Sequence, residues 1–280
     1  MSCARAVGLT HFDLSGGRMA RMKPVYDHIG IGYTKHRCAD LRIAHALVKA
    51  IGLAPPAILA DIGSGTGNYS RAVADLGYHV KAVEPSIIMY DQAASHDSVD
   101  RLSGFAERIP LADASVDGVF CVLASHHFSS LHAALGEMAR ICPAGPIVWF
   151  TFDPRQAEIP WLQDYFPALW KSTFGVFPPL GEVCNLFETR TGRHVDVFPW
   201  PIPFDLQDCF MAAGWRRPEM YLDPEVRSSM SAFALADQAV LGEGLSRLKH
   251  DIATGAWRSR HRDLLERQAV DWGYRFLRAA

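Results

Sequence analysis

This 280-residue sequence has no long apolar run, no charge excess of one sign and no paired cysteines. A transmembrane helix needs roughly 18 consecutive apolar residues, and no run reaches that length, so we expect no membrane span. The 28 lysines and arginines nearly balance the 30 aspartates and glutamates, and the formal net charge is −2. Nucleic acids and anionic membranes favour basic surfaces. The charge balance therefore argues against nonspecific binding to either partner.

The six cysteines are scattered and form no C-x-x-C pair, which is typical of neither a disulfide framework nor a zinc site. Such cysteine usage fits a reducing cytoplasm. The N-terminal residues lack the continuous apolar core of a signal peptide, and residues 1–24 are expected to form a flexible tail. We therefore expect a cytoplasmic protein. Its hydrophobic fraction of 49% and charged fraction of 21% are ordinary for a globular chain.

A glycine-rich turn follows the first strand-like run. Residues 57–69 form a short apolar strand, a turn with Gly63, Gly65 and Gly67, and a helix start, which is the layout of a doubly wound α/β fold. Glycine has no Cβ, so the backbone can turn sharply and pass close to a ligand. The spacing is not that of the dinucleotide fingerprint, because Asn68 stands where G-x-G-x-x-G requires glycine. No Gly-Lys-Ser/Thr of a P-loop follows either.

A second strand-like run, from His79 to Glu84, ends in an acidic residue. Glu84 lies 23 residues after Asp61, close to the ~20-residue offset of a ribose-binding acid in nucleotide folds. A carboxylate at this point can accept hydrogen bonds from both ribose hydroxyls. The alternative is that Glu84 caps a surface helix that begins at Pro85 and Ser86.

Another apolar run, over residues 119–124, is followed by Ser125, His126 and His127. Its near-continuous apolar character indicates a central parallel strand covered on both faces, and ligands bind outside the carboxyl ends of such strands. A histidine there can act as a general base, because its unperturbed pKa lies near neutrality. An amphipathic helix over residues 129–141 and an apolar strand over residues 147–152 follow.

Five segments between residues 25 and 152 together resemble the motifs of class I S-adenosylmethionine (SAM) methyltransferases, in the ubiquinone/menaquinone C-methyltransferase-like branch. They are Tyr26–Arg37 ahead of a helix over 39–51, the D-x-G-x-G-x-G turn, the strand that ends at Glu84, Gly-x-Ala-Glu-x-Ile-Pro at residues 104–110, and the strand before His127. The resemblance implies a Rossmann-like, seven-stranded methyltransferase sheet. It also implies SAM as cofactor, S-adenosylhomocysteine (SAH) as product, and direct SN2 transfer of a methyl group to a small-molecule acceptor without a metal.

The resemblance also assigns residues to the site. The cofactor contacts that it implies are Asp61, Gly63, Ser64, Gly65, Thr66 and Gly67 in the turn, Glu84, Pro85, Ser86 and Met89 after the second strand, Ala106 and Glu107 at the adenine, Leu123 after the fourth strand, and Tyr26, Tyr33 and Arg37 from the segment ahead of the turn. His127, with His126 beside it, is the candidate catalytic base. The alternatives are that the histidine packs against the following helix and that the tyrosines pack on the sheet.

Residues 25–152 are thus expected to form a SAM-binding core, and residues 153–280 a mostly helical substrate or lid region that adds the remaining strands. Helices are predicted over 159–172, 205–213, 224–236, 238–250 and 256–269, and strands over 194–200 and 273–277, the last of them antiparallel. Aromatic residues between Trp161 and Phe177 favour an apolar or aromatic acceptor beneath a lid. Ordinary core packing is the alternative for these aromatic residues.

Three other functions remain as alternatives. The chain could bind SAM or SAH for regulation without turnover, and the intact turn and Glu84 are compatible with that. It could methylate tRNA or another macromolecule, although the near-neutral charge and the absence of an added basic domain argue against this. A nucleotide-linked oxidoreductase is disfavoured by the missing third glycine of its fingerprint.

Overall fold

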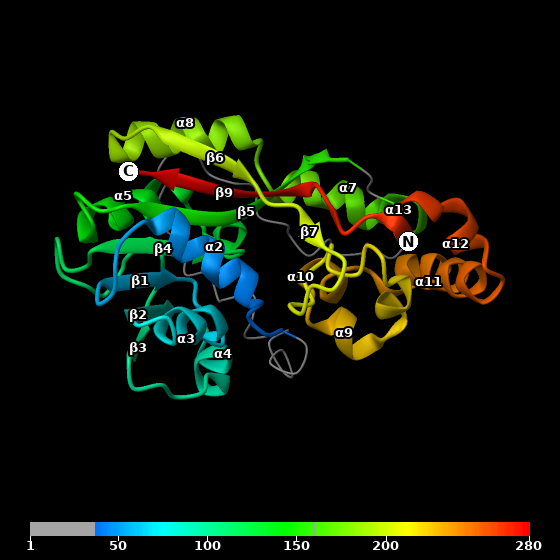
Figure 1. Ribbon diagram of the computed structural model, residues 1–280, viewed down its shortest axis with the longest axis horizontal. Helices are drawn as coiled ribbons and strands as arrows, with labels where there is room; N and C mark the ends of the chain where they lie inside the picture. Colours follow the sequence, from blue (N-terminus) through cyan, green and yellow to red (C-terminus); the bar gives the residue numbers. More distant parts are fainter. Residues whose placement is uncertain (1–36, 159–160) are drawn as a thin grey trace, which may run out of the picture.

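A computed structural model of the protein describes residues 37–158 and 161–280. Its centre is a seven-stranded sheet with the order β3-β2-β1-β4-β5-β9-β6 (Figure 1). The strands are β1 (Ile58–Ile62), β2 (His79–Glu84), β3 (Val99–Ser103), β4 (Gly118–Val122), β5 (Ile147–Ala157), β6 (Val195–Pro199) and β9 (Trp272–Ala279). Strands β1 to β5 pair in parallel, whereas β9 is antiparallel to both β5 and β6. The doubly wound sheet and its antiparallel C-terminal strand are confirmed.

Helices cover both faces of this sheet because successive strand residues point to opposite sides. Leu59, Phe120 and Val148 pack with the helices α2 (Leu41–Ile51) and α3 (Asn68–Ala74) in one apolar cluster. Ala60, Val119 and Trp149, each next to one of those residues in sequence, pack in a second cluster on the other face, with α5 (Leu131–Ile141) and α8 (Leu180–Thr191).

Capping residues in the sequence set both ends of helix α2. The Asp40 side chain accepts a hydrogen bond from the Arg42 backbone N–H and caps the first turn. Gly52 ends the helix with a left-handed φ of 71°. Between these caps, Ile43 and Leu47 are fully buried at helical spacing, so α2 packs on the sheet against β4, β5 and β9 and beside α3.

The C-terminal half is less regular than the sequence predicts. Instead of one helix over 159–172, α6 (Leu162–Tyr165) and α7 (Pro167–Val176) are separated at Phe166, which leaves the helical region (φ −128°, ψ 58°). Proline disfavours helical backbone in the residue before it and starts helices well. The prediction of one continuous helix was therefore wrong at Pro167.

The helix predicted over residues 205–213 does not form. The backbone there turns repeatedly, with Phe210 N–H donating to the Asp208 carbonyl and Ala213 N–H to the Phe210 carbonyl. The Arg217 guanidinium donates to the carbonyls of Leu206 and Ala213 at 2.6 and 2.9 Å. These contacts occupy groups that a helix would pair within itself, so tertiary contacts override the local helical pattern.

The remaining C-terminal helices are shorter than the sequence predicts, except for one. The long helix is α11, which runs over Gln238–Ala253. The short helices are η3 (Pro218–Leu222), α9 (Pro224–Ser228), α10 (Ser231–Ala234), α12 (Ala256–Arg260) and α13 (Arg262–Glu266). Two short strands, β7 (Ile202–Pro203) and β8 (Ala269–Val270), pair with each other. Figure 1 shows these helices gathered beyond the ends of β1 and β5. The carboxyl ends of the parallel strands therefore face the C-terminal half.

Aromatic residues of the C-terminal half pack in the protein core. Trp161, Tyr165, Phe166 and Trp170 are each exposed by 5% or less and belong to the same apolar cluster as α2. Core packing therefore accounts for them, and the interpretation of these four as a lid over an acceptor is not supported. Within the described residues, no helix is both long and apolar enough to cross a bilayer.

Candidate functional site

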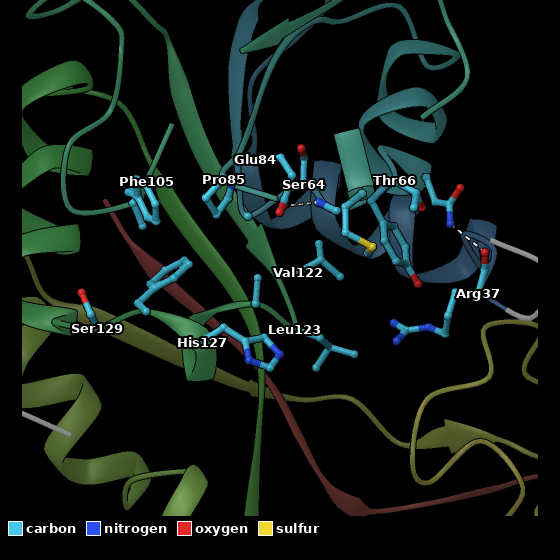
Figure 2. Close-up of a pocket in the computed structure, with 18 of the residues that line it drawn as sticks. Arg37, Ser64, Thr66, Glu84, Pro85, Phe105, Val122, Leu123, His127 and Ser129 are labelled. Carbon is cyan, nitrogen blue, oxygen red and sulfur yellow. Dashed lines mark hydrogen bonds between the residues drawn. The ribbon is translucent and has the colours of Figure 1, made fainter. Parts of the chain in front are cut away.

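An open cavity of about 1120 Å³, including solvent at its mouth, lies at the carboxyl ends of β1, β2 and β4. Figure 2 shows Phe105 and Pro85 toward one end, Arg37 toward the other, and Glu84 and Ser64 between them. The predicted residues that line it are Arg37, Gly63, Ser64, Gly65, Thr66, Glu84, Pro85, Met89, Ala106, Glu107, Leu123 and His127. The two ends of the cavity therefore differ in chemistry, with an aromatic ring at Phe105 and a guanidinium at Arg37.

The glycine turn forms one wall through a backbone conformation that other residues rarely adopt. Gly63 and Gly65 have φ values of 76° and 57°. A Cβ on Gly63 would lie 2.6 Å from the Ala124 Cβ, which is too close for any side chain. The backbone N–H groups of Gly63 and Ser64 both donate to the Val83 carbonyl, which fixes the turn to β2.

Glu84 ties this turn to the next strand. Its carboxylate is 7% exposed and lies at the end of β2. Oε2 accepts a hydrogen bond from Gly65 N–H at 2.8 Å, and Oε1 accepts one from Ser86 N–H at 2.9 Å. Ser86 caps α4 (Ile87–Gln92). Glu84 therefore lines the cavity, and Ser86, not Glu84, is the cap of α4. Contact between Glu84 and a ribose stays a prediction.

Glu107 lies near the Phe105 end of the cavity and also supports α5. Its Oε1 accepts from Ser129 Oγ at 2.8 Å and from the backbone N–H groups of Ser129 and Ser130. Ser130 caps α5. The neighbouring Phe105 is 42% exposed at the mouth. This end of the cavity thus combines a carboxylate, backbone groups and an aromatic face, which suits a flat heterocycle.

Four predicted site residues do not line this cavity, and their contact with a ligand stays a prediction. Asp61 is 2% exposed, and its carboxylate accepts a hydrogen bond from Ser70 Oγ at 2.6 Å. Burial raises the pKa of Asp61 to about 7. Ser86 is buried as the α4 cap, Gly67 lines a separate small cavity beside Arg71, and His126 lies in another small cavity.

Tyr26 and Tyr33 lie outside the described residues. Eight lining residues were not predicted: Asn68, Tyr69, Phe105, Val122, Ala124, Phe128, Ser129 and Asp208. Seven of them are neighbours in sequence of a predicted motif, and this closeness could have identified them. Asp208 had no such signal, because it lies in the irregular turns of the C-terminal half.

The two histidines occupy different surroundings on the short helix η2 (Ser125–His127). His127 lines the main cavity, while the ring of His126 lies tilted between those of His127 and Phe177, with ring centroids 3.9 and 4.5 Å away. Burial, and then the Arg37 charge, lower the pKa of His127 to about 4. Burial also lowers the pKa of His126 well below its ordinary value. Both rings are therefore uncharged at neutral pH.

Replacing His127 by glutamine is expected to remove part of the protein's acid sensitivity. The unfolded chain protonates this histidine near its ordinary pKa of 6.5, but the folded protein does so only near pKa 4. Between these values the unfolded state binds more protons, so the free energy of unfolding falls as the pH falls. From pH 7 to pH 4 the wild type should lose on the order of 2–3 kcal/mol more than His127→Gln in urea unfolding.

The exposed His79 at the start of β2 supplies the matched control. His79→Gln should follow the wild-type dependence on pH. Parallel curves for wild type and His127→Gln would contradict a His127 that stays neutral in the folded protein down to about pH 4.

A family model described as a methyltransferase domain matches residues 60–150. The chain is 40% identical over 91 residues to a malonyl-[acyl-carrier protein] O-methyltransferase of Pectobacterium atrosepticum, covering 32% of this chain and 36% of that protein. It is 32% identical over 126 residues to the ubiquinone/menaquinone biosynthesis C-methyltransferase UbiE of Rubrivivax gelatinosus, covering 44% and 48%. The match thus spans about a third to a half of the length of these curated relatives.

A solved structure resembles nearly the whole described fold. It is described as a proposed methyltransferase from an antibiotic biosynthesis pathway of Anabaena variabilis. The sequence identity is 46%, the TM-score is 0.85, and the likeness covers 88% of this chain and 99% of that one. The similarity therefore extends through the C-terminal half, beyond the segment that the family model matches.

Proposed function

Because the chain belongs to the class I SAM-dependent methyltransferases, we propose that it transfers the methyl group of SAM to a small-molecule acceptor by direct SN2 displacement. The observation that carries the proposal is the hydrogen bond of 2.8 Å between Gly65 N–H and Glu84. It joins the glycine turn and the acidic strand end in the wall of one cavity.

The residues of this cavity fit SAM. The two Glu84 oxygens can accept hydrogen bonds from vicinal ribose hydroxyls, since a carboxylate offers about four acceptor positions. Phe105, Ala106 and Glu107 offer an aromatic face, backbone groups and an acceptor to the adenine. The open backbone of the glycine turn suits the methionine part. When bound, SAM supplies an electrophilic methyl group on a sulfonium.

The chain's own contribution to transfer is to orient the reactants and exclude water. Val122, Leu123 and Phe128 present apolar surface beside the glycine turn. Leu123 keeps a left-handed φ of 50°, which costs roughly 1–2 kcal/mol in a residue other than glycine. Its backbone N–H donates to the Phe150 carbonyl at 2.8 Å, which helps to hold this conformation. Alignment of the reactants against this apolar surface lowers the barrier of a bimolecular reaction.

The acceptor must be nucleophilic by itself, because the cavity offers little base catalysis. His127 lines the cavity, but its pKa of about 4 makes it a weak base at neutral pH. The acceptor should therefore present a nucleophilic atom that needs little deprotonation near pH 7. The two curated relatives are named for oxygen and carbon methylation respectively, so their shared core is compatible with more than one acceptor atom.

The proposal is tested by following SAH formation with a panel of acceptors. Carboxylates, thiols, amines and quinols are incubated with the protein and SAM, and SAH and the methylated product are quantified by mass spectrometry. We expect equal amounts of SAH and product with at least one small-molecule class, and none without acceptor. SAH binding without turnover on any acceptor would favour a regulatory binding protein instead.

A further inference from the structure

Two cysteines meet beside the Arg37 end of the cavity. Cys38 precedes α2, and Cys209 lies in the turns of the C-terminal half. The Cys38 thiol donates to the Gln207 carbonyl at 3.4 Å, and the Cys209 thiol donates to the same carbonyl at 3.6 Å. Because both sulfur atoms contact one oxygen atom, two residues far apart in sequence form a close thiol pair. All five cysteines of the described residues are free thiols.

The two chain segments that carry the thiol pair lie side by side. The Gln207 backbone N–H donates to Asp40 Oδ2 at 3.1 Å, and the Arg42 guanidinium forms an ion pair with Asp205 at 2.6 Å. A disulfide requires its two Cα atoms to lie within about 7 Å of each other. Backbones held in contact at several points are suited to such a bond.

Each cysteine directly follows a residue that lines the cavity. Arg37 precedes Cys38, Asp208 precedes Cys209, and both Arg37 and Asp208 line the cavity. The Arg37 guanidinium forms a forked ion pair with Asp208, through Nε to Oδ1 and through Nη2 to Oδ2 at 3.2 Å. A bond between the thiols would therefore tie together the two segments that form this end of the cavity. Noncovalent contacts alone allow such segments to separate transiently.

The surroundings of the two thiols set how fast they react. Cys38 is exposed and Cys209 is partly buried. Burial, and next the Asp208 charge, raise the pKa of both thiols. The other charged side chains that act on the pair are Asp40, Arg37 and Arg217. Both thiols are therefore largely protonated at neutral pH, and their exchange with another disulfide should become faster as the pH rises.

We propose that Cys38 and Cys209 form a reversible disulfide that joins the two segments at the Arg37 end of the cavity and slows release of the bound ligand. The oxidant is a small-molecule disulfide, such as oxidised glutathione. The Cys38 thiol loses its proton and attacks one sulfur of the oxidant, whose S–S bond breaks and releases one glutathione thiolate.

The second step closes the bond within the protein. The Cys209 thiol loses its proton and attacks the Cys38 sulfur, and the bond between Cys38 and glutathione breaks. The two released glutathione thiolates take up the two protons. The two protein thiols are thereby oxidised to a disulfide, and one glutathione disulfide is reduced to two thiols.

The effect on the ligand rests on the proposed function, because it takes SAM or SAH as the ligand, whereas the bond itself forms without a ligand. A disulfide between residues far apart in sequence restricts the unfolded chain and so raises thermal stability. It also prevents the two joined segments from separating, so a ligand between them should leave more slowly.

The bond is tested first, in the absence of any ligand. The full-length protein is equilibrated with oxidised or reduced glutathione at about pH 8.5, where thiolates are more abundant. Free thiols are then alkylated, and linked peptides are identified by mass spectrometry. We expect a crosslink between Cys38 and Cys209 that dithiothreitol reverses. The thermal midpoint of the oxidised protein should exceed that of the reduced protein by roughly 5–15 °C.

Single substitutions separate this pair from the other thiols. Cys38→Ser and Cys209→Ser should each abolish the crosslink and the difference in thermal midpoint. The matched control is Cys184→Ser, because Cys184 is also a partly buried free thiol but lies on α8 and does not line the cavity. This variant should keep both the crosslink and the difference in thermal midpoint.

The second measurement is the rate at which labelled SAH leaves the protein when unlabelled SAH is added in excess. The oxidised wild type should release SAH at least about threefold more slowly than the reduced wild type. In Cys209→Ser the two redox treatments should give the same rate.

Three results would overturn the proposal. Glutathione attached to Cys38 without any crosslink to Cys209 would show that the two thiols do not reach each other. Equal release rates in both redox states of a protein that carries the crosslink would refute the effect on the ligand. Failure of the reduced wild type to bind SAH would refute the proposed function and the effect on the ligand with it, even where the crosslink forms.

Discussion

Glu84→Gln is expected to weaken SAH binding by on the order of 1.5–3 kcal/mol, the usual effect of losing a hydrogen bond to a charged group. Two effects combine at this position. An amide has one acceptor oxygen instead of two, so the ribose hydroxyls lose an anionic partner. The amide nitrogen also faces one of the two backbone N–H groups, of Gly65 or Ser86, that now donate to Glu84.

Calorimetric titration with SAH measures this loss, and thermal unfolding of the free variant tests whether the turn still folds. Glu182→Gln is the matched control, because Glu182 is exposed on α8 and does not line the cavity. An unchanged SAH affinity in a folded Glu84→Gln variant would mean that Glu84 only supports the turn and α4.

Gly65→Val is expected to reduce SAH binding at least about tenfold, or about 1.4 kcal/mol. Gly65 has a φ of 57°, and a Cβ there would lie 3.3 Å from the Met89 Cε. Both residues line the cavity, so the added side chain occupies space at the ligand. The left-handed backbone also costs a branched residue roughly 1–2 kcal/mol.

A control at another left-handed glycine separates strain from obstruction. Gly192 ends α8 with a φ of 69°, and a Cβ there would meet no atom within 4 Å. Gly192→Val should lower thermal stability by an amount similar to Gly65→Val and leave SAH affinity intact. If both variants bind SAH as well as the wild type does, the glycine turn is not at the ligand.

Most of the sheet core could be predicted from short-range patterns in the sequence. The glycine turn and the acid at Glu84 lie next to the strands that position them, so their spacing already places them at one sheet edge. The C-terminal strand was also predicted, because residues 273–277 alternate in side-chain character as a strand does. In the structure β9 inserts between β5 and β6.

Local sequence patterns predicted the C-terminal half less well. The helix break at Phe166 was predictable from Pro167, which is a local signal that the helix prediction overlooked. The turns around Asp208 are instead held by contacts from distant residues. Asp208 meets Arg37 across 171 positions of sequence, and no spacing rule connects them. The motif places Asp61 just ahead of the glycine turn, but it does not show that the carboxylate points toward Ser70.

The central claim is that the cavity at the ends of β1, β2 and β4 is an adenosyl-cofactor site, and the most direct test is calorimetric titration of the unmodified protein with SAM, SAH and NADH. The account predicts that SAM and SAH each bind at a single site and that NADH does not bind. Binding of NADH, or of none of the three ligands, would contradict it.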